Sequence, residues 1–442
     1  MRSLSGGLPR WAGISLLVVV SANMPHPQEA WTVSDLGTLG GFAGDADDIN
    51  DAGHVVGASN AASGNERAFL WTPSGGMIDL GTLGGLRSEA RAINNAGRVV
   101  GSSSLPGQPG QPDGATHAFL RTATGMMIDL GTLGEIFPGF SFSGANDINE
   151  LGQIVGESST PGGSHSVLWT PTGSIVDLGT LGGSQSSAWA INEGGQVVGR
   201  SDTADGDQHA FLWTQADGMV DLGTLGGSTS SALDINEAGQ VVGRAATANG
   251  DEHAFLWTKA GGMIDLGTLG APGSRSQAEG INDAGQVVGL FNDNDDHAFY
   301  WTPAGGMIEL PTLTGIESGA RAINNGGQIA GYGDISTGDA HAVVWNNAST
   351  PPTPEEQIES LTTSIIALVE EGSLKSGQAN GLMRPLQNAL RSVAAGRPAS
   401  ACSQLSDFLA EVSRKVLDGA LTPGEGAALS QAATSIQSAL GC

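Results

Sequence analysis

DLGTLGGSTSSALDINEAGQVVGRAATANGDEHAFLWT, residues Asp221–Thr258, is the clearest copy of a motif that the chain contains seven times, in whole or in part. The DLGTLG tag begins at Asp35, Asp79, Asp129, Asp177, Asp221 and Asp265, and it returns as ELPTLT from Glu309. Successive starts lie 44, 50, 48, 44, 44 and 44 residues apart. An Ile-Asn tag and a segment close to HAFLWT recur in the same order. A period of this length indicates a repeat architecture.

Each repeat contains four short segments with β-strand character. In the fifth repeat these segments are Ser231–Asn236, Gln240–Arg244, His253–Thr258 and Met263–Gly267. Glycine-containing turns separate the first segment from the second and the third from the fourth. Four strands in about 44 residues are typical of one blade of a β-propeller. A solenoid of strands is the competing geometry.

The phase of the repeat favours a closed ring over a solenoid. The chain enters on a last-strand tag, Trp31–Gly37, and leaves after the third strand of the seventh unit, His341–Trp345. The N-terminal segment can therefore supply the fourth strand that the seventh unit lacks. The sequence predicts a mainly β fold, with a closed seven-bladed propeller of four-stranded blades over residues 31–347.

Residues 1–22 have the pattern of a secretory signal peptide. Arg2 and Arg10 are followed by the apolar run Ile14–Val20, and small residues end this segment at Ala22, with cleavage expected there or as late as Ala30. The apolar run is too short to span a membrane. We therefore expect a secreted, extracellular protein, free or associated with the cell surface, with no membrane insertion after signal removal.

The formal net charge of −27 lies almost entirely in the repeat region. A negative field of this size repels nucleic acid and anionic lipid. We therefore expect no nucleic-acid partner, and cationic, neutral or basic ligands are compatible with the surface.

A Pro-rich linker, residues 348–355 (ASTPPTPE), separates the repeats from a C-terminal region of different periodicity. Apolar residues recur at helical spacing over residues 356–442, which predicts a small all-α four-helix domain. Its second helix contains Pro385, which either lies in the first turn or kinks the helix. Cys402 and Cys442 are the only cysteines, and in an exported chain they favour a disulfide with each other. Two buried thiols, or pairing of Cys442 between chains, are the alternatives.

Two family resemblances follow from these segments. The repeats, with HAFLWT, GMIDLGTLGG and INEAGQVVG, resemble the bacterial "probable extracellular repeat, HAF family" over Trp31–Trp345. The stretch Ile358–Leu440, with EEGSLKSGQANGLM, LQNALRSV and CSQLSDFLAEV, is similar to the FIMAH domain, a helical module at the C-termini of secreted bacterial proteins. The resemblances imply location and architecture, and they imply no reaction and no catalytic residues.

Residues that occupy one repeat position are interpreted as structural. A histidine begins the third strand in six repeats and Arg67 does so in the first; the histidines are His117, His165, His209, His253, His297 and His341. Equivalent strand starts in different blades are far apart, so we expect hydrogen bonds within each blade and no ring of metal ligands. The acidic loops Asp202–Asp207, Asn249–Glu252 and Asn292–Asp296 could hold Ca²⁺. They lack the full EF-hand pattern, so we expect no cofactor, with Ca²⁺ as the weaker alternative.

The loops that vary between repeats all fall on one face of the predicted propeller. The loop Glu135–Ser143 contains three phenylalanines, and binding residues usually lie on loops of this kind. The position two residues before the Ile of each Ile-Asn tag also varies: Asp47, Arg91, Asn146, Trp189, Leu233, Glu279 and Arg321. We expect ligand contacts from Phe137, Phe140 and Phe142 on the rim and from Trp189, Arg91 and Arg321 nearer the channel. Packing of the phenylalanines against the propeller is the alternative.

Two functional hypotheses follow. The first is a secreted, monomeric, non-catalytic binding or scaffold propeller that recognises an extracellular glycan or protein through its variable-loop face, with a helical docking module. The second is a secreted enzyme that degrades polysaccharide or peptide at the channel mouth. The sequence has no nucleophile elbow, zinc-ligand motif or phosphate-binding loop, which favours the first hypothesis and assigns no catalytic residue.

Overall fold

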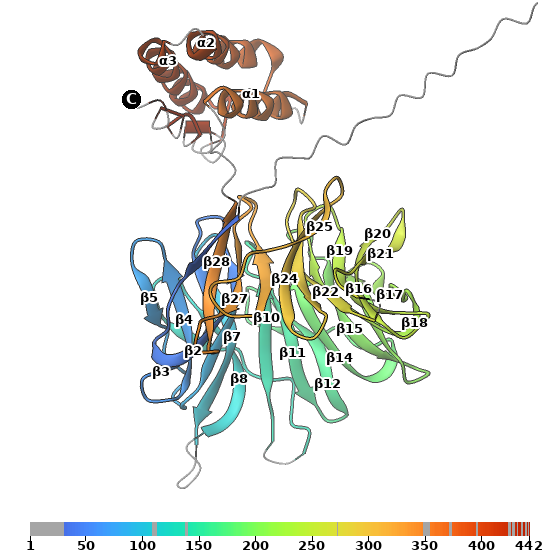
Figure 1. Cartoon of the computed structure of the whole chain (residues 1–442). Coiled ribbons are helices and arrows are strands. Elements are labelled where there is room, and N and C mark those ends of the chain that lie inside the picture. Colours follow the sequence, from blue (N-terminus) through green and yellow to red (C-terminus); the bar gives the residue numbers. More distant parts are fainter. Residues whose placement is uncertain are drawn as a thin grey trace, which may run out of the picture.

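The computed structural model describes residues 31–107, 113–137, 140–271, 273–347, 354–370, 374–394, 397–422 and parts of 426–442. The predicted signal peptide lies outside these described residues, and so does most of the predicted linker. The described chain is mainly β, with strands β1 to β28 followed by helices α1 to α3 (Figure 1).

Five separate four-stranded antiparallel sheets form the blades of a propeller-like arrangement (Figure 1). Four of them follow the chain: β2 (Gly40–Ile49), β3 (Val55–Ala61), β4 (Glu66–Thr72) and β5 (Gly76–Asp79); β6 (Ser88–Ile93), β7 (Val99–Pro106), β8 (Asp113–Arg121) and β9 (Met127–Asp129); β10 (Ser143–Ile148), β11 (Ile154–Thr160), β12 (Gly163–Trp169) and β13 (Ile175–Asp177); β22 (Arg275–Ile281), β23 (Val287–Asn292), β24 (Asp296–Thr302) and β25 (Gly306–Glu309). The fifth joins both ends of the repeat region: β26 (Ser318–Ile323), β27 (Ile329–Asp334), β28 (Ala340–Asn347) and β1 (Trp31–Asp35).

The fourth and fifth repeats form a single eight-stranded sheet. Its strands are β14 (Gly182–Ile191), β15 (Val197–Thr203), β16 (Gln208–Thr214), β17 (Gly218–Asp221), β18 (Gly226–Ile235), β19 (Val241–Thr247), β20 (Glu252–Thr258) and β21 (Gly262–Gly267). A parallel pairing of Gln208 with Thr229 joins β16 to β18, because β18 begins early enough to lie beside β16. This corrects the predicted closed propeller of seven separate four-stranded blades: five blades are separate, and the other strands share one sheet.

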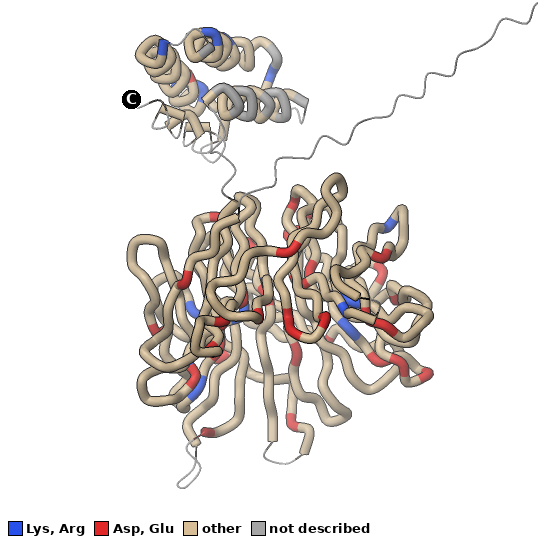
Figure 2. The backbone as a smooth tube through the Cα atoms, viewed as in Figure 1, with Lys and Arg blue, Asp and Glu red and all other residues tan. Residues whose placement is uncertain are grey.

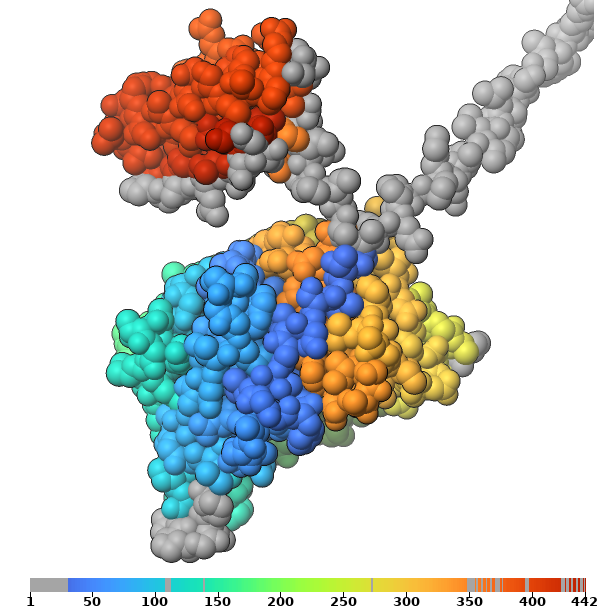
Figure 3. All heavy atoms as spheres, turned by 60° about the vertical axis from the view of Figure 1, so that its left-hand side comes forward, coloured from blue at the N-terminus to red at the C-terminus, as the bar shows by residue number. Residues whose placement is uncertain are grey.

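The pairing of the first strand with the last is confirmed. β1 lies antiparallel to β28, with Trp31 opposite Asn347 and Asp35 opposite Val343. In the space-filling view the blue N-terminal strand lies directly against the orange C-terminal strands (Figure 3). Trp31 and Val33 pack on the cluster that contains the fully buried Trp345. The two ends of the repeat region therefore complete one sheet.

Apolar side chains fill the space between neighbouring sheets. One cluster joins Val56 and Ala68 of one blade to Ile93, Val99 and Phe119 of the next, and all five are buried. Burial of one such side chain contributes roughly 1.5–3 kcal/mol. The Val-Val and His-Ala-Phe segments recur because each sheet has to cover its neighbour.

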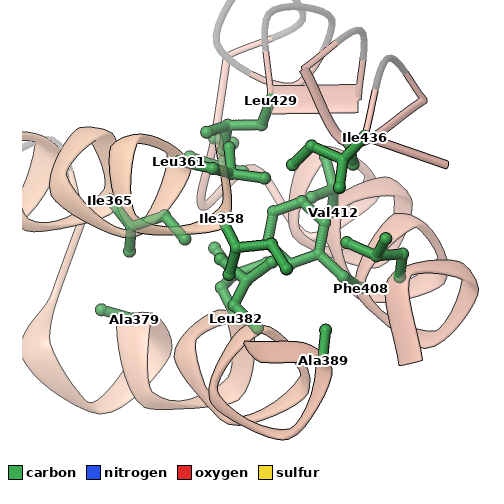
Figure 4. Packing of buried hydrophobic residues seen from close by; sticks show 14 of the residues in the cluster. Ile358, Leu361, Ile365, Ala379, Leu382, Ala389, Phe408, Val412, Leu429 and Ile436 are labelled. Carbon is green, nitrogen blue, oxygen red and sulfur yellow. The ribbon is translucent and has the colours of Figure 1, made fainter. Parts of the chain in front are cut away.

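The C-terminal region contains α1 (Pro354–Glu370), α2 (Ser376–Ala394) and α3 (Pro398–Leu417). Ile358, Leu382 and Phe408, one from each helix, meet in a fully buried core, to which Leu429 and Ile436 also contribute (Figure 4). The predicted fourth helix lies partly outside the described residues. Pro385 lies inside α2, well beyond its first turn.

A disulfide joins Cys402 to Cys442, with the Cα atoms 6.0 Å apart, as predicted. A closed loop of this length stabilises a fold by about 4 kcal/mol in the chain-entropy model. Among the described helices, none has both the length and the apolar character needed to cross a membrane.

Candidate functional site

The first strand of each four-stranded unit, which we call its inner strand, has a β-bulge at the position that varies between repeats. The antiparallel register between an inner strand and the second strand of its unit skips one residue every time; the skipped residues are Asp47, Arg91, Asn146, Trp189, Leu233, Glu279 and Arg321. A bulge leaves this residue outside the ladder and re-aims its side chain. The fold therefore fixes the bulge and leaves its side chain free to vary.

A glycine near the start of each second strand explains why the bulge recurs. It is the last residue of a VVG tag in five repeats and of IVG or IAG in the other two. A Cβ added to Gly57 would lie 2.0 Å from the backbone oxygen of Asp45, two residues before the bulge residue of β2. The same distance recurs at Gly101, Gly156, Gly199, Gly243, Gly289 and Gly331. No side chain fits against a backbone at this distance, so this glycine is a structural requirement.

The bulge residues lie on seven inner strands that neighbour one another in a ring, and we call the space that this ring encloses the channel. Each inner strand contacts the next along the chain, and β26 contacts β2. The Arg91 guanidinium donates to Asn146 Oδ1 on the neighbouring inner strand at 2.5 Å. Asn146 in turn donates to the backbone oxygen of Ala188 on β14 at 2.7 Å. The structure thus brings residues that are about 50 positions apart in the sequence into direct contact.

Charged side chains occupy one arc of this channel, on β22, β26, β2 and β6. Arg321 pairs with Asp45 at 3.1 Å and with Glu279 at 3.5 Å. Arg91 pairs with Glu89 at 3.2 Å. The exposed fractions of these side chains range from 12% for Glu279 to 36% for Asp45, so the arc is accessible to a ligand. We call these residues, with Asp47, the charged arc; Trp189 and Leu233 lie on the remaining inner strands.

Several polar groups of the channel residues have no partner among the described residues. They include three buried atoms, Asp45 Oδ1, Arg321 Nε and Trp189 Nε1, which make no hydrogen bond. Buried polar atoms are nearly always paired in folded proteins, because an unpaired one costs about 1–3 kcal/mol. Unpaired donors and an acceptor at one site are therefore more typical of a binding site than of a structural core.

The carboxylates of the charged arc are crowded. Although these side chains still reach solvent in the channel, withdrawal from bulk water raises the pKa of Asp47 well above its ordinary value, and the charges of Asp45 and Glu89 add to this effect. Burial likewise raises the pKa of Asp45, against the opposing effect of Arg321. These effects disfavour the charged form of both carboxyl groups, and Figure 2 shows how few basic residues the propeller carries.

The opposite end of the channel, at the turns between first and second strands, is closed by a ring of asparagines. Each side-chain amide donates to the backbone oxygen of the asparagine in the next repeat, at 3.0–3.2 Å, and Asn324 donates back to Asn50. The next residue in each repeat forms a second ring, in which its side-chain oxygen accepts the backbone N–H of the preceding repeat at 2.5–3.1 Å. We call this the turn end, and we call the part of the channel that begins at the bulge residues, three positions before each asparagine, the loop end.

The turn end has a structural role. A hollow of about 200 Å³ lies there, and its lining residues already bind one another in the two rings. Within the described part of the chain, no group of three or more His, Cys, Asp or Glu side chains is arranged to hold a metal ion. A larger hollow of about 540 Å³ lies beside Leu212 and Trp257, and nearly all its lining residues recur in other repeats. It is therefore a crevice between repeats.

Three half-buried aspartates strengthen the turn end in alternate repeats. Asp48, Asp147 and Asp234 each accept the backbone N–H of the following isoleucine and of the equivalent isoleucine in the next repeat, at 2.7–2.8 Å. Burial is the main cause that raises their pKa, to about 6, about 8 and about 7 respectively. The other repeats have alanine or glycine here. The aspartates therefore act as bridges between neighbouring inner strands.

The histidines form hydrogen bonds within blades, which confirms the structural interpretation. In six repeats, the histidine Nδ1 lies 2.7–3.0 Å from the carboxylate that begins the DLG or ELP tag. Arg67 pairs with Asp79 at 3.2 Å in the first repeat. Each pair fastens the third strand of a blade to its outermost strand.

The predicted rim residues divide into two environments. Phe137 and Phe140 are 57% and 44% exposed, and their rings stack 4.9 Å apart. Phe142 is half-buried and its ring lies 6.4 Å from that of Phe140. The structure places Arg91 and Arg321 in the charged arc, Trp189 on the adjoining wall, and the phenylalanines on the loop before β10.

Three further exposed apolar residues were missed by sequence reasoning. Phe42, Leu86 and Ile316 are 64%, 37% and 64% exposed. Each lies five residues before a bulge residue, respectively Asp47, Arg91 and Arg321. With Phe137 and Phe140 they form what we call the apolar rim, at the starts of β26, β2, β6 and β10. The signal that could have identified them is this constant offset from the varied position.

Comparisons with known proteins bear on the two regions separately. Residues 358–438 match the FIMAH domain. A search of curated protein sequences finds no match. The repeat region is distantly similar in shape to TolB from Acinetobacter baumannii, with 12% identity and a TM-score of 0.41, covering 62% of this chain and 64% of TolB. It is also similar to a Mycobacterium tuberculosis puromycin-hydrolyzing peptidase, with 12% identity and a TM-score of 0.48, covering 71% of this chain and 53% of the peptidase.

The chain therefore spans less than two thirds of either of these structures. Identities and scores this low indicate a distant likeness of shape and nothing more. The FIMAH match confirms the predicted C-terminal module and covers a minor part of the chain. The propeller-like region is followed by a helical region that matches the FIMAH domain.

Proposed function

We propose that this protein is an exported, non-catalytic binding propeller that holds an extracellular ligand, a glycan or a protein, at the loop end of its channel. The helical domain serves as a docking module in this proposal. Export is consistent with the disulfide between Cys402 and Cys442, since such bonds persist in oxidising compartments.

One observation carries the proposal. The bulge position has the same backbone geometry in all seven inner strands, yet it holds six different residue types. The residues around it, by contrast, repeat because the fold needs them, as the VVG glycine and the Ile-Asn pair do. A position that the fold leaves free, and that faces a shared space, is where a repeat protein can build one asymmetric ligand site.

The unpaired groups of the channel residues support the same conclusion. Trp189 Nε1, Arg321 Nε and Asp45 Oδ1 are buried atoms that the described protein groups leave unpaired, so a ligand would satisfy them after a small side-chain movement on binding. The cost of leaving them unpaired would then be offset on binding. Hydrogen bonds from such fixed groups also give selectivity between similar ligands.

The test is a binding screen of the purified mature chain against a glycan array and a peptide array, with three variants in parallel. Arg91→Ala and Trp189→Ala should each weaken binding at least tenfold. Lys259→Ala, an exposed change in a turn on the opposite face, is the matched control and should bind like the wild type. Melting temperatures should be recorded for every variant, so that loss of binding is separated from loss of fold.

Ligand recovered after prolonged incubation should be chemically unchanged. Cleavage products would contradict the non-catalytic proposal. Wild-type binding by both channel variants would place the site elsewhere on the molecule.

A further inference from the structure

An unpaired carboxylate lies at the centre of the charged arc. Asp47 is the bulge residue of β2, and among the described residues it makes no hydrogen bond and no ion pair. The two arginines of the arc pair with other groups, Arg321 with Asp45 and Glu279, and Arg91 with Glu89. Four carboxylates thus face two guanidinium groups. A cationic group that enters the channel would meet a carboxyl group with no ion-pair partner among the described residues, next to the charges of Asp45 and Glu89, and would favour its charged form.

The geometry excludes a divalent metal ion as the cation of this site. Hard cations need several oxygen ligands converging on one point. Within the described residues, no group of three or more acidic, histidine or cysteine side chains has such an arrangement. The carboxylates of the arc come from separate strands, and Asp45 and Glu279 are held by Arg321. An ammonium or guanidinium group is the cation that fits, because it can be bound by one or two carboxylates.

Apolar residues begin the same strands that hold the charged arc. Ile316, Phe42 and Leu86 precede the bulges of β26, β2 and β6, and Phe137 and Phe140 precede β10. Exposed apolar groups gathered on one rim indicate a surface that meets a partner. Five residues of strand correspond to about 16 Å at roughly 3.3 Å per residue. The ligand therefore has to be amphipathic on this scale, with a cationic end and an apolar end.

A short extended peptide has these dimensions. Its own residues advance by the same roughly 3.3 Å, so side chains about five residues apart would reach Asp47 and the apolar rim together. A neutral glycan offers no cation for Asp47 and has little apolar surface for the exposed rim.

We infer that the ligand is a polypeptide segment with a Lys or Arg side chain that enters the channel to pair with Asp47, and with an apolar side chain about five residues away that packs on the apolar rim. This inference rests on the proposed function, and it narrows the ligand from a glycan or a protein to a basic polypeptide segment. Association is assisted by the negative field of the repeat region, which attracts a basic segment.

The probe is a set of acetylated, amidated, fluorescent octapeptides with a glycine and serine background. One position is Lys, Arg, Gln or Glu, and the position five residues away is Leu, Phe or Ser. Fluorescence polarisation measures their affinity for the full mature chain. We expect Lys or Arg with Leu or Phe to bind best, Gln to bind at least tenfold more weakly, and Glu to show no binding.

The decisive variant is Asp47→Asn. Asparagine occupies the same bulge position in the third repeat, as Asn146, so the substitution suits the fold. It should abolish the preference for Lys and Arg over Gln. Phe42→Ser combined with Ile316→Ser should abolish the preference for Leu and Phe while the charge preference stays. Asp205→Asn removes one charge from an exposed loop residue and is the matched control, with unchanged binding expected.

The outcomes distinguish this inference from the proposed function. Equal binding of Lys and Gln peptides, or an unchanged preference in Asp47→Asn, would overturn the inference. If a glycan alone binds and Arg91→Ala abolishes that binding, the inference is wrong and the proposed function stands. If neither a peptide nor a glycan binds at the loop end, both fail.

Discussion

The turn end and the loop end of the channel are built from the same seven repeats by opposite means. At the turn end one residue type, asparagine, recurs and closes a ring of hydrogen bonds. At the loop end the bulge position has the same geometry in each repeat, yet its side chains are as different as those of Trp189 and Arg321. Repetition thus identifies side chains that the fold requires, and variation at a fixed geometry identifies those it does not.

The two ends also differ in how their polar groups are paired. At the turn end, side-chain oxygens and amides pair in two complete circles. At the loop end, three buried polar atoms and the Asp47 carboxylate have no partner among the described residues. Stability and recognition are therefore assigned to opposite ends of one channel.

The largest effect should come from removing the strand on which both ends depend. A chain that begins at residue 38 lacks β1, so β28 loses its outer partner and the Trp345 cluster loses Trp31 and Val33. Loss of this packing should cost about 5 kcal/mol or more in the free energy of unfolding. Urea denaturation, with a chain that begins at residue 31 as the control, measures this. Equal midpoints would show that the first strand is dispensable.

A pair of substitutions three residues apart in the fifth repeat compares the two ends directly. Asn236→Ala at the turn end leaves the Asn282 backbone oxygen and the Gln240 N–H without their side-chain partners, and should cost about 2–4 kcal/mol. Leu233→Ala, three residues earlier at the loop end, should cost about 1 kcal/mol or less, because its side chain is only half-buried. Denaturant midpoints test the difference. Equal losses would remove the contrast between the two ends.

The aspartate bridges give the turn end a pH dependence. The folded-state pKa of Asp147, about 8, lies above its ordinary value of 3.8, so its stabilising contribution is complete below about pH 4 and is lost as pH rises through 8. Asp147→Ala should therefore lower the melting temperature by several degrees at pH 5 and by clearly less at pH 9. Alanine at the same position of the fourth repeat, Ala190, shows that the fold accepts the change. A difference that does not vary with pH would contradict the bridge.

The smallest effect on stability should come from Asp47→Asn at the loop end. The raised pKa of Asp47 means that its charged form is disfavoured in the folded protein. Its contribution to stability is lost as pH rises through that raised value, so the variant should be equal to or slightly more stable than the wild type at pH 8. Thermal melts at pH 8 check this. A destabilised variant would show that Asp47 has a structural role.

Much of this architecture could be predicted from the sequence because it depends on local period. The strands, the pairing of Trp31–Asp35 with Val343–Asn347, and the Cys402–Cys442 bond follow from spacing and number. The eight-stranded sheet was not predicted, since it depends on one pairing, Gln208 with Thr229, between two repeats. Contacts of that kind depend on how sheets lie side by side, which the sequence of one repeat does not encode.

The candidate site was predicted in part for the same reason. The varied position was evident from aligned repeats, and it identified Arg91, Trp189 and Arg321. That it lies on a bulge, and that Asp47 is left unpaired, required the register and the partners of both arginines. Phe42 and Ile316 were missed because the loops were compared by length and not by distance from the bulge.

The pairing of β1 with β28 also sets the order in which this molecule can fold. Thr32 and Asn346, which are bonded in the finished sheet, are 314 residues apart. Contacts this distant in sequence form slowly, because closing a long loop costs entropy before any packing compensates for it. During synthesis Trp31–Asp35 emerges first among the strands and has no partner until Ala340–Asn347 has been made. The first of the described strands to be made is therefore among the last to pair, and the nascent chain keeps an open sheet edge until nearly all the repeats exist.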